Sequence, residues 1–149
     1  MTTPTTRRPV PARPTSSASA RKTFAIVTGI AVLFIFVQSI TAGTFIEDGL
    51  PESAKNTWTD VHGFIAYPVM VFSLLAAIVA FRGLRGSGAV PLMAGLLFVA
   101  TVVQWLSGHA ISTLGMDWVT PFHVALAFVV YGIAIWLSIA SARLRREAV

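Results

Sequence analysis

Cysteine is absent from this chain of 149 residues, so the chain itself can form no disulfide, thiolate metal site, iron–sulfur cluster or covalent c-type haem linkage. The sequence also has no phosphate-binding glycine loop, serine nucleophile elbow or zinc-ligand spacing. Glu47, Asp48 and Asp60 fall in or beside a predicted solvated loop, without a partner for acid–base chemistry. The common hydrolase classes are therefore not supported, and we assign no catalytic residue.

Charged residues are scarce as well, at 11% of the chain against 55% for hydrophobic residues. The hydrophobic residues gather in four stretches of about twenty residues, each long enough to cross a hydrocarbon core of about 30 Å as a helix. We expect these spans at about residues 24–46, 59–81, 90–112 and 121–142. The predicted fold is an all-α integral membrane four-helix bundle, residues 23–142, between a disordered basic tail, residues 1–22, and a short C-terminal tail, residues 143–149.

The distribution of charge predicts how the chain is oriented. All but one of the 11 Lys and Arg residues lie in the two tails and the middle loop, the exception being Lys55, and all but one of the 6 acidic residues lie in or beside the other two loops. By the positive-inside rule, both termini are expected to be cytoplasmic in a multi-pass protein of the bacterial plasma membrane. The net charge of +5 then indicates anchoring to anionic lipid of the bilayer rather than nucleic-acid binding.

The two predicted hairpins share a pattern of polar and small residues. In each, a glutamine in the first helix and a histidine in the second are both followed, four residues later, by a small residue. These pairs are Gln38 with Ala42 and His62 with Ala66 in the first hairpin, and Gln104 with Gly108 and His123 with Ala127 in the second. The pattern predicts a duplicated two-helix unit.

His62 and His123 occupy equivalent places in this repeat, near the outer ends of their helices. A pseudo-two-fold axis would bring their imidazoles to face each other across the bundle, where they could supply both axial ligands of one haem iron. Ala66 and Ala127 share a helix face with the histidines and leave space for a flat macrocycle. We therefore expect haem b as the cofactor, with His62 and His123 as the metal ligands.

Three further residues are candidates for the same site. Gln38 and Gln104 are buried amides that need a partner, either a ligand histidine or a haem propionate. His109 is either a donor to the ligand shell or an alternate ligand. The open alternatives are that the histidines are interfacial residues bonded to loop carbonyls, and that the glutamines only hold helices together.

The same residues carry a resemblance to a known family over roughly residues 24–142. The segments are Gln38-Ser-Ile-Thr-Ala-Gly43, His62-Gly-Phe-Ile-Ala66, Gln104-Trp-Leu-Ser-Gly108 and His123-Val-Ala-Leu-Ala127. The pattern resembles one half of haem A synthase and, more closely, a family of small four-helix bacterial membrane proteins. The resemblance implies a bundle with axial histidines at His62 and His123 and haem toward the outer leaflet. Haem A synthase resembles two such bundles fused, whereas this chain supplies one and lacks the cysteine pair of part of that family.

The leading functional hypothesis is a bis-histidine b-type haem protein that transfers electrons or handles haem, with a redox partner, a larger membrane complex or a homodimer as its setting. One alternative is a haem-free structural or accessory membrane subunit. Another is a small transporter, in which Gln38 and Gln104 face a polar path. The sequence leaves open whether the protein is an enzyme, and leans against it.

Overall fold

The computed structural model describes residues 16–146, and every regular element in that part of the chain is helical. The elements are the helices α1 (Ala18–Phe45), α2 (Glu52–Gly83), α3 (Val90–Leu114) and α4 (Thr120–Arg146), with a short 3-10 helix, η1 (Asp117–Val119), before α4. All four long helices are long and apolar enough to cross a membrane, as a multi-pass membrane protein requires. The predicted all-α four-helix bundle is confirmed.

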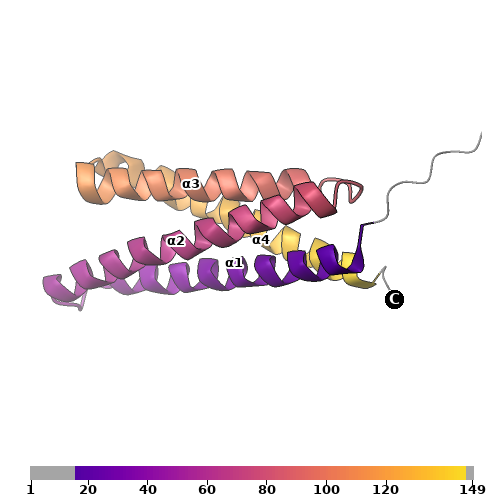
Figure 1. The fold of residues 1–149 in the computed structure, drawn as a ribbon. Coiled ribbons are helices and arrows are strands. Elements are labelled where there is room, and N and C mark those ends of the chain that lie inside the picture. The colour runs from indigo at the N-terminus through magenta and orange to yellow at the C-terminus, as the bar shows by residue number, and fades with distance from the viewer. Residues whose placement is uncertain (1–15, 147–149) are drawn as a thin grey trace, which may run out of the picture.

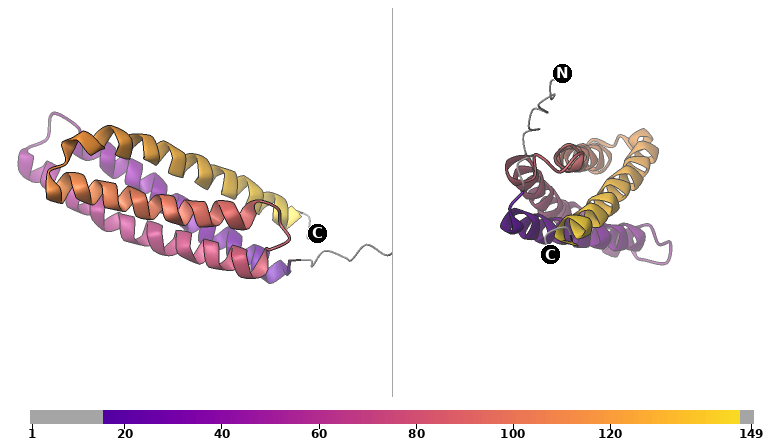
Figure 2. Two further views of the ribbon diagram at one scale, coloured as in Figure 1. Left: turned by 90° about the horizontal axis from the view of Figure 1, so that it is seen from above. Right: turned by 90° about the vertical axis from the view of Figure 1, so that its right-hand side faces the viewer.

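The four helices form a closed ring in which each packs against two neighbours (Figures 1 and 2). The packed pairs are α1 with α2, α2 with α3, α3 with α4, and α4 with α1. Within residues 16–146, α1 and α3 do not approach each other at the backbone, nor do α2 and α4. The two helices that carry His62 and His123 are therefore diagonal partners across the bundle.

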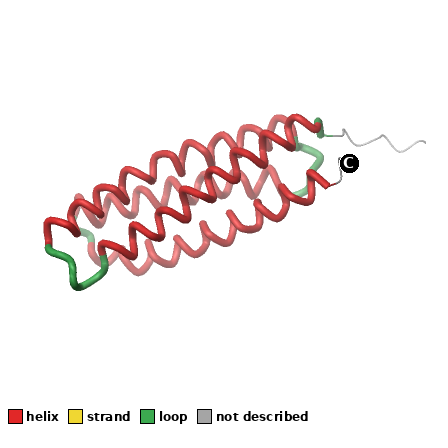
Figure 3. The backbone as a smooth tube through the Cα atoms, turned by 90° about the horizontal axis from the view of Figure 1, so that it is seen from below, coloured by secondary structure: helices red, strands yellow, loops and turns green. Residues whose placement is uncertain are grey.

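The connections alternate between the two ends of the bundle (Figure 3). One end holds the start of α1, the loop between α2 and α3 and the end of α4, and it carries Arg21, Arg82, Arg85 and the arginines of the last turn of α4. We call it the basic end. The other holds the loop after α1 and the turn after α3, with Glu47, Asp48 and Asp117, and we call it the acidic end.

Helices at the basic end extend further than the predicted spans. Of the predicted tail 1–22, residues 18–22 belong to α1, because the Ser17 hydroxyl caps the helix by accepting from the Ala20 N–H at 3.1 Å. Arg21 then donates to the carbonyls of Ser16 and, at 3.1 Å, of Leu144 in α4. Similarly, α4 includes residues 143–146 of the predicted C-terminal tail. Residues 1–15 and 147–149 lie outside the described residues.

At the acidic end, α2 begins at Glu52, before the predicted start of its span at 59. Pro51 precedes the first turn and Glu52 places a carboxylate where the helix dipole favours negative charge. α3 ends at Leu114 and is followed by the capping residue Gly115, whose φ of 65° is the left-handed conformation that glycine adopts without strain. Hydropathy predicts where a helix lies in the membrane, whereas caps and turns decide where it ends.

The tightly packed core occupies the half of the bundle nearer the basic end. Its buried residues recur every three or four positions, as the inner face of a helix requires. They are Phe24, Thr28, Ala31 and Ile35 of α1; Val69, Ser73, Ala76, Ala77 and Ala80 of α2; Val90, Pro91, Ala94, Leu97 and Thr101 of α3; and Val130, Ala134, Leu137 and Ser141 of α4, with Leu84 after α2. Beyond this core only Thr41, among the described residues, is buried toward the acidic end.

The difference between the halves is visible in the helix paths. The α1–α2 hairpin and the α3–α4 hairpin run close together at the basic end and spread apart toward the acidic end (Figure 1). Close approach at the basic end depends on small residues: a Cβ added to Gly83 of α2 would lie 2.6 Å from the Cβ of Ala20 in α1. The bundle is therefore clamped at one end and more open at the other.

Candidate functional site

The inner faces of the four helices continue from the core directly into the predicted site residues. In α2, Ala66 and His62 lie three and seven residues before buried Val69, and in α4, Ala127 and His123 hold the same positions relative to Val130. On a helix such spacings fall on one face. These four residues are half-buried, so the interior of the bundle remains partly accessible here. The structure thus brings both predicted ligands to the inner surface of its open half.

The first hairpin holds His62 through α1. Its Nδ1 lies 3.0 Å from the Thr41 hydroxyl and 3.1 Å from the backbone carbonyl of Gln38. A carbonyl only accepts, and the Thr41 hydroxyl already donates to that same carbonyl at 2.9 Å, so Nδ1 must carry the ring proton. The lone pair is then on Nε2, which makes no hydrogen bond to another described residue.

The second hairpin holds His123 in a matching way through α3. The Ser107 hydroxyl donates to the Gln104 carbonyl at 2.9 Å and lies 2.8 Å from His123 Nδ1. Because its single proton is used, the hydroxyl accepts from Nδ1–H, and the lone pair of His123 is also on Nε2. Nε2 is the nitrogen that a histidine with a hydrogen-bonded Nδ1–H offers to a metal. Both imidazoles are therefore held in the tautomer that has the proton on Nδ1 and the lone pair on Nε2.

Each glutamine donates a hydrogen bond to the backbone carbonyl of the histidine in its own hairpin. The side-chain amide of Gln38 donates to the His62 carbonyl at 2.9 Å, and that of Gln104 donates to the His123 carbonyl at 3.0 Å. Only the second has a further contact: Gln104 Nε2 lies 3.0 Å from His123 Nε2. The surroundings of the two histidines thus differ in one hydrogen bond. The amide of Gln104 occupies the lone pair of His123 Nε2, whereas the lone pair of His62 Nε2 has no such partner among the described residues.

The side-chain oxygens of the same two glutamines are buried without a hydrogen-bond partner among the described residues. A buried, unpaired carbonyl costs about 1–3 kcal/mol, so a pair of them at equivalent positions is unusual. Each oxygen is an acceptor without a donor in the described part of the chain.

Small residues leave room beside the rings. A Cβ added at Gly108 would lie 3.1 Å from Cε1 of His123, so the imidazole packs directly against the backbone of α3. Ala66 of α2 and Ala127 of α4 are small side chains on the same helix face as the histidines, so they occupy little space beside the rings. On the first hairpin, Phe45 covers His62 edge-on, with ring centroids 5.4 Å apart.

Sequence reasoning missed Thr41 and Ser107, the hydroxyls that orient the two rings. The signal was present, because each follows its glutamine by three residues, Gln38 to Thr41 and Gln104 to Ser107. Residues three and four apart share a helix face, so Thr41 and Ser107 lie on the same face as the glutamines and the small residues at position four. The matching hydrogen bonds agree with the predicted repeat, although the duplication itself stays a prediction.

His109 lies apart from this pair. It is exposed, its Nδ1 is 3.2 Å from Thr113 on its own helix, and its ring stacks on Trp105 at 5.7 Å. Trp105 in turn contacts Tyr67 of α2, with centroids 6.1 Å apart. The structure therefore places His109 in an aromatic cluster on the α2–α3 surface, and its role in ligand binding stays a prediction.

Within residues 16–146, no three His, Asp or Glu side chains gather as a metal site. Two cavities, of about 520 and 300 Å³, lie nearer the basic end, and neither is lined by a histidine. Comparison of the chain with protein-family models, curated proteins and solved structures found no match. The functional argument therefore rests on the site itself.

Proposed function

We propose that this protein is a multi-pass protein of the bacterial plasma membrane that binds one b-type haem between His62 and His123. The observation that carries the proposal is the tautomer of the two imidazoles. Each Nδ1–H is held by a hydroxyl of the neighbouring helix, Thr41 or Ser107, and each Nε2 keeps its lone pair. If the histidines were only interfacial residues bonded to loops, no matching pair of hydroxyl groups from the neighbouring helices would be expected.

The surroundings of the pair fit a haem better than a small metal ion. Two protein ligands leave a bare metal ion under-coordinated, whereas a porphyrin supplies four nitrogens and asks the protein for one or two axial donors. The half of the bundle around the histidines is less tightly packed, and Ala66 and Ala127 are small.

Bound haem would supply one-electron chemistry, and the residues of the chain decide how it is held. His62 offers Nε2 at once, whereas His123 offers it only after Gln104 gives up its hydrogen bond. One ligand is thus ready and the other is exchangeable. This difference favours haem handling, in which a haem is accepted and passed on, over permanent bis-histidine electron transfer.

The proposed orientation puts the basic end in the cytoplasm and the histidines toward the outer leaflet. It is supported by the arginines at the basic end and the acidic residues at the other. On this view the lipid bilayer is the constant partner, and a haem donor, a haem acceptor or a redox protein reaches the site from the acidic end. We assign no nucleic-acid partner and no catalytic residue.

The test is the absorption spectrum of the protein purified in mild detergent after expression with haem supply, oxidised and then reduced with dithionite. We expect a b-type spectrum near one haem per chain, and loss of haem binding in His62→Ala and His123→Ala. His109→Ala tests the third histidine separately, and we expect it to keep the spectrum because His109 lies apart from the pair. A folded protein without haem bands, or normal bands in both ligand variants, would refute the proposal. An accessory subunit would then be favoured, or a transporter if the protein in vesicles shows flux.

A further inference from the structure

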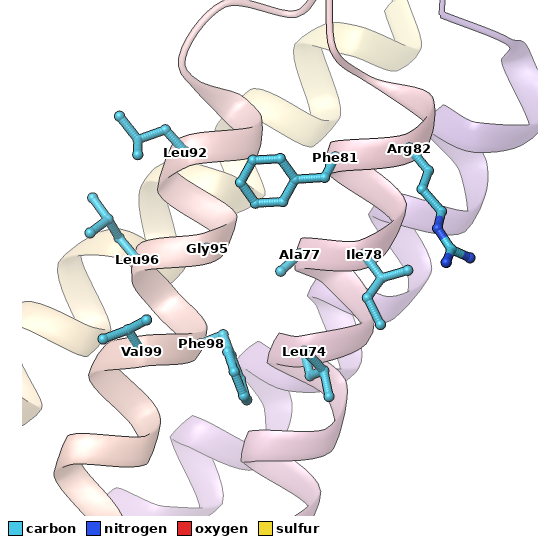
Figure 4. A pocket seen from close by; sticks show the side chains of 10 residues that line it. All are labelled: Leu74, Ala77, Ile78, Phe81, Arg82, Leu92, Gly95, Leu96, Phe98 and Val99. Carbon is cyan, nitrogen blue, oxygen red and sulfur yellow. The ribbon is translucent and has the colours of Figure 1, made fainter.

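An apolar groove of about 520 Å³ lies between α2 and α3 near the basic end (Figure 4). Its walls are Leu74 and Ile78 of α2 and Leu92, Leu96 and Val99 of α3, all of them exposed. These residues are spaced by three or four positions, so each wall is a straight ridge along its helix. The groove therefore runs parallel to the helices, which is the direction that lipid chains take in a bilayer.

The length of the groove matches one leaflet. From Leu74 to Arg82 the helix rises by about 12 Å, against about 15 Å for half of the hydrocarbon core. Its floor is formed where the ring of Phe81 lies over Gly95: a Cβ at that glycine would be 3.1 Å from the ring. Figure 4 shows Phe81 directed across toward α3, with Leu92 and Leu96 beyond it. An extended hydrocarbon chain fits such a channel.

Arg82, in the last turn of α2, is the charged residue among those that line the groove. Its backbone lies near the end of the groove at the α2–α3 loop, with its side chain on the side of α2 away from α3 (Figure 4). It is exposed and makes no hydrogen bond or ion pair with another residue of the described chain. Its neighbour Arg85 is different, because its Nε donates to the Phe81 carbonyl at 2.7 Å and so closes the last turn of α2. No acidic residue lies at this end between residues 16 and 146. The positive charge of Arg82 is therefore free for an anion at the headgroup level.

We propose that the α2–α3 groove is a binding site for one anionic phospholipid, with an acyl chain between the two helices and the phosphate paired with Arg82. The charge of Arg82 selects an anionic headgroup over a zwitterionic one, and the apolar walls hold the chain. This inference does not rest on haem binding, because the groove and the histidines lie at opposite ends of the bundle.

Two pairs of matched variants test the site in detergent, with phosphatidylglycerol or phosphatidylcholine of identical chains as the probes. Arg82→Gln removes this charge, and Arg145→Gln removes an exposed charge at the same end that lines no groove. Val99→Trp fills the groove from a position that is 56% exposed, and Val103→Trp adds the same bulk one turn away at a position 47% exposed. The readouts are the melting temperature and, by native mass spectrometry, the number of retained lipids.

We expect phosphatidylglycerol to raise the melting temperature of the wild type more than phosphatidylcholine does, and one phosphatidylglycerol to be retained per chain. Arg82→Gln should lose most of that selectivity, Val99→Trp should lose the retained lipid, and both controls should behave as wild type. Equal losses in Arg82→Gln and Arg145→Gln would mean only diffuse attraction of anionic lipid, and would overturn the proposal. So would a dimer that Val99→Trp dissociates, since a second copy would then occupy the groove.

Discussion

The sharpest prediction concerns Gln104, whose amide covers the lone pair of His123. Replacing it by leucine puts an apolar side chain of similar size at this position and removes the 3.0 Å hydrogen bond to His123 Nε2. In the wild type that bond must break before the nitrogen can bind iron. Gln104→Leu should therefore bind haem more tightly than the wild type.

The size of the effect follows from the one bond that is lost. A neutral hydrogen bond contributes about 0.5–1.5 kcal/mol net, which corresponds to roughly a two- to twelve-fold change in affinity. The variant also loses the bond from Gln104 to the His123 carbonyl, and the matched variant Gln38→Leu loses the equivalent bond to His62. Because Gln38 has no bond to the imidazole Nε2, comparison of the two variants isolates the contact that matters.

The assay is a titration of the haem-free protein with haemin in detergent, followed by the Soret band. We expect the dissociation constant of Gln104→Leu for haemin to be lower than that of Gln38→Leu, by roughly two- to twelve-fold. If both variants weaken binding alike, the glutamines contact the bound haem instead, and the reasoning about a covered ligand is refuted. Equal affinities for the wild type and both variants would refute it as well.

Three other predictions use the same material. Ser107→Ala removes the hydroxyl that accepts from Nδ1–H of His123. Haem affinity, measured in the same titration, should fall by about 10–100-fold, which is the usual cost of losing such a hydrogen bond behind a ligand histidine. An unchanged affinity would contradict the assigned tautomer. Because the chain has no cysteine, the single variants Asp48→Cys and Arg145→Cys report membrane topology without background labelling. In intact cells, a maleimide that does not cross the membrane should label Asp48→Cys and not Arg145→Cys. The reverse result would show the opposite orientation. The double variant His62→Ala, His123→Ala should melt, without haem, close to the haem-free wild type, and a large drop would make these residues structural.

Much of the fold was accessible from the sequence because a bilayer leaves few choices. Backbone groups in lipid must be satisfied within the segment, so four apolar stretches predict four helices, and short connections predict hairpins. The pairing of Gln38 with His62 and of Gln104 with His123 could be anticipated from their equivalent positions. Their actual contacts, amide to backbone carbonyl, could not.

What remained hidden depends on side-chain rotamers and helix rotation. The hydroxyl of Ser107 reaches His123 Nδ1 only because α3 and α4 pack with Gly108 against the ring. Glutamine and histidine hold the same positions in the two hairpins, so these two residue types do not explain the difference between Gln38 and Gln104, although the small residue beside them differs, Ala42 in the first hairpin and Gly108 in the second. The difference arises from how each ring turns relative to its glutamine, and a sequence pattern carries no information about that rotation.

Core and candidate site occupy different halves of the same four helices, and this separation explains how one small bundle can serve both purposes. In lipid, helices associate by close packing of small residues and a few interhelical hydrogen bonds. Here Ala76 and Ala80 of α2 supply such packing near the basic end, and Ser73 bonds to Thr101 of α3 at 3.0 Å at its boundary. With the bundle held there, the opposite half can tolerate small residues and unpaired amide oxygens around the histidines. A ligand that fills that half then adds contacts that the protein does not make by itself.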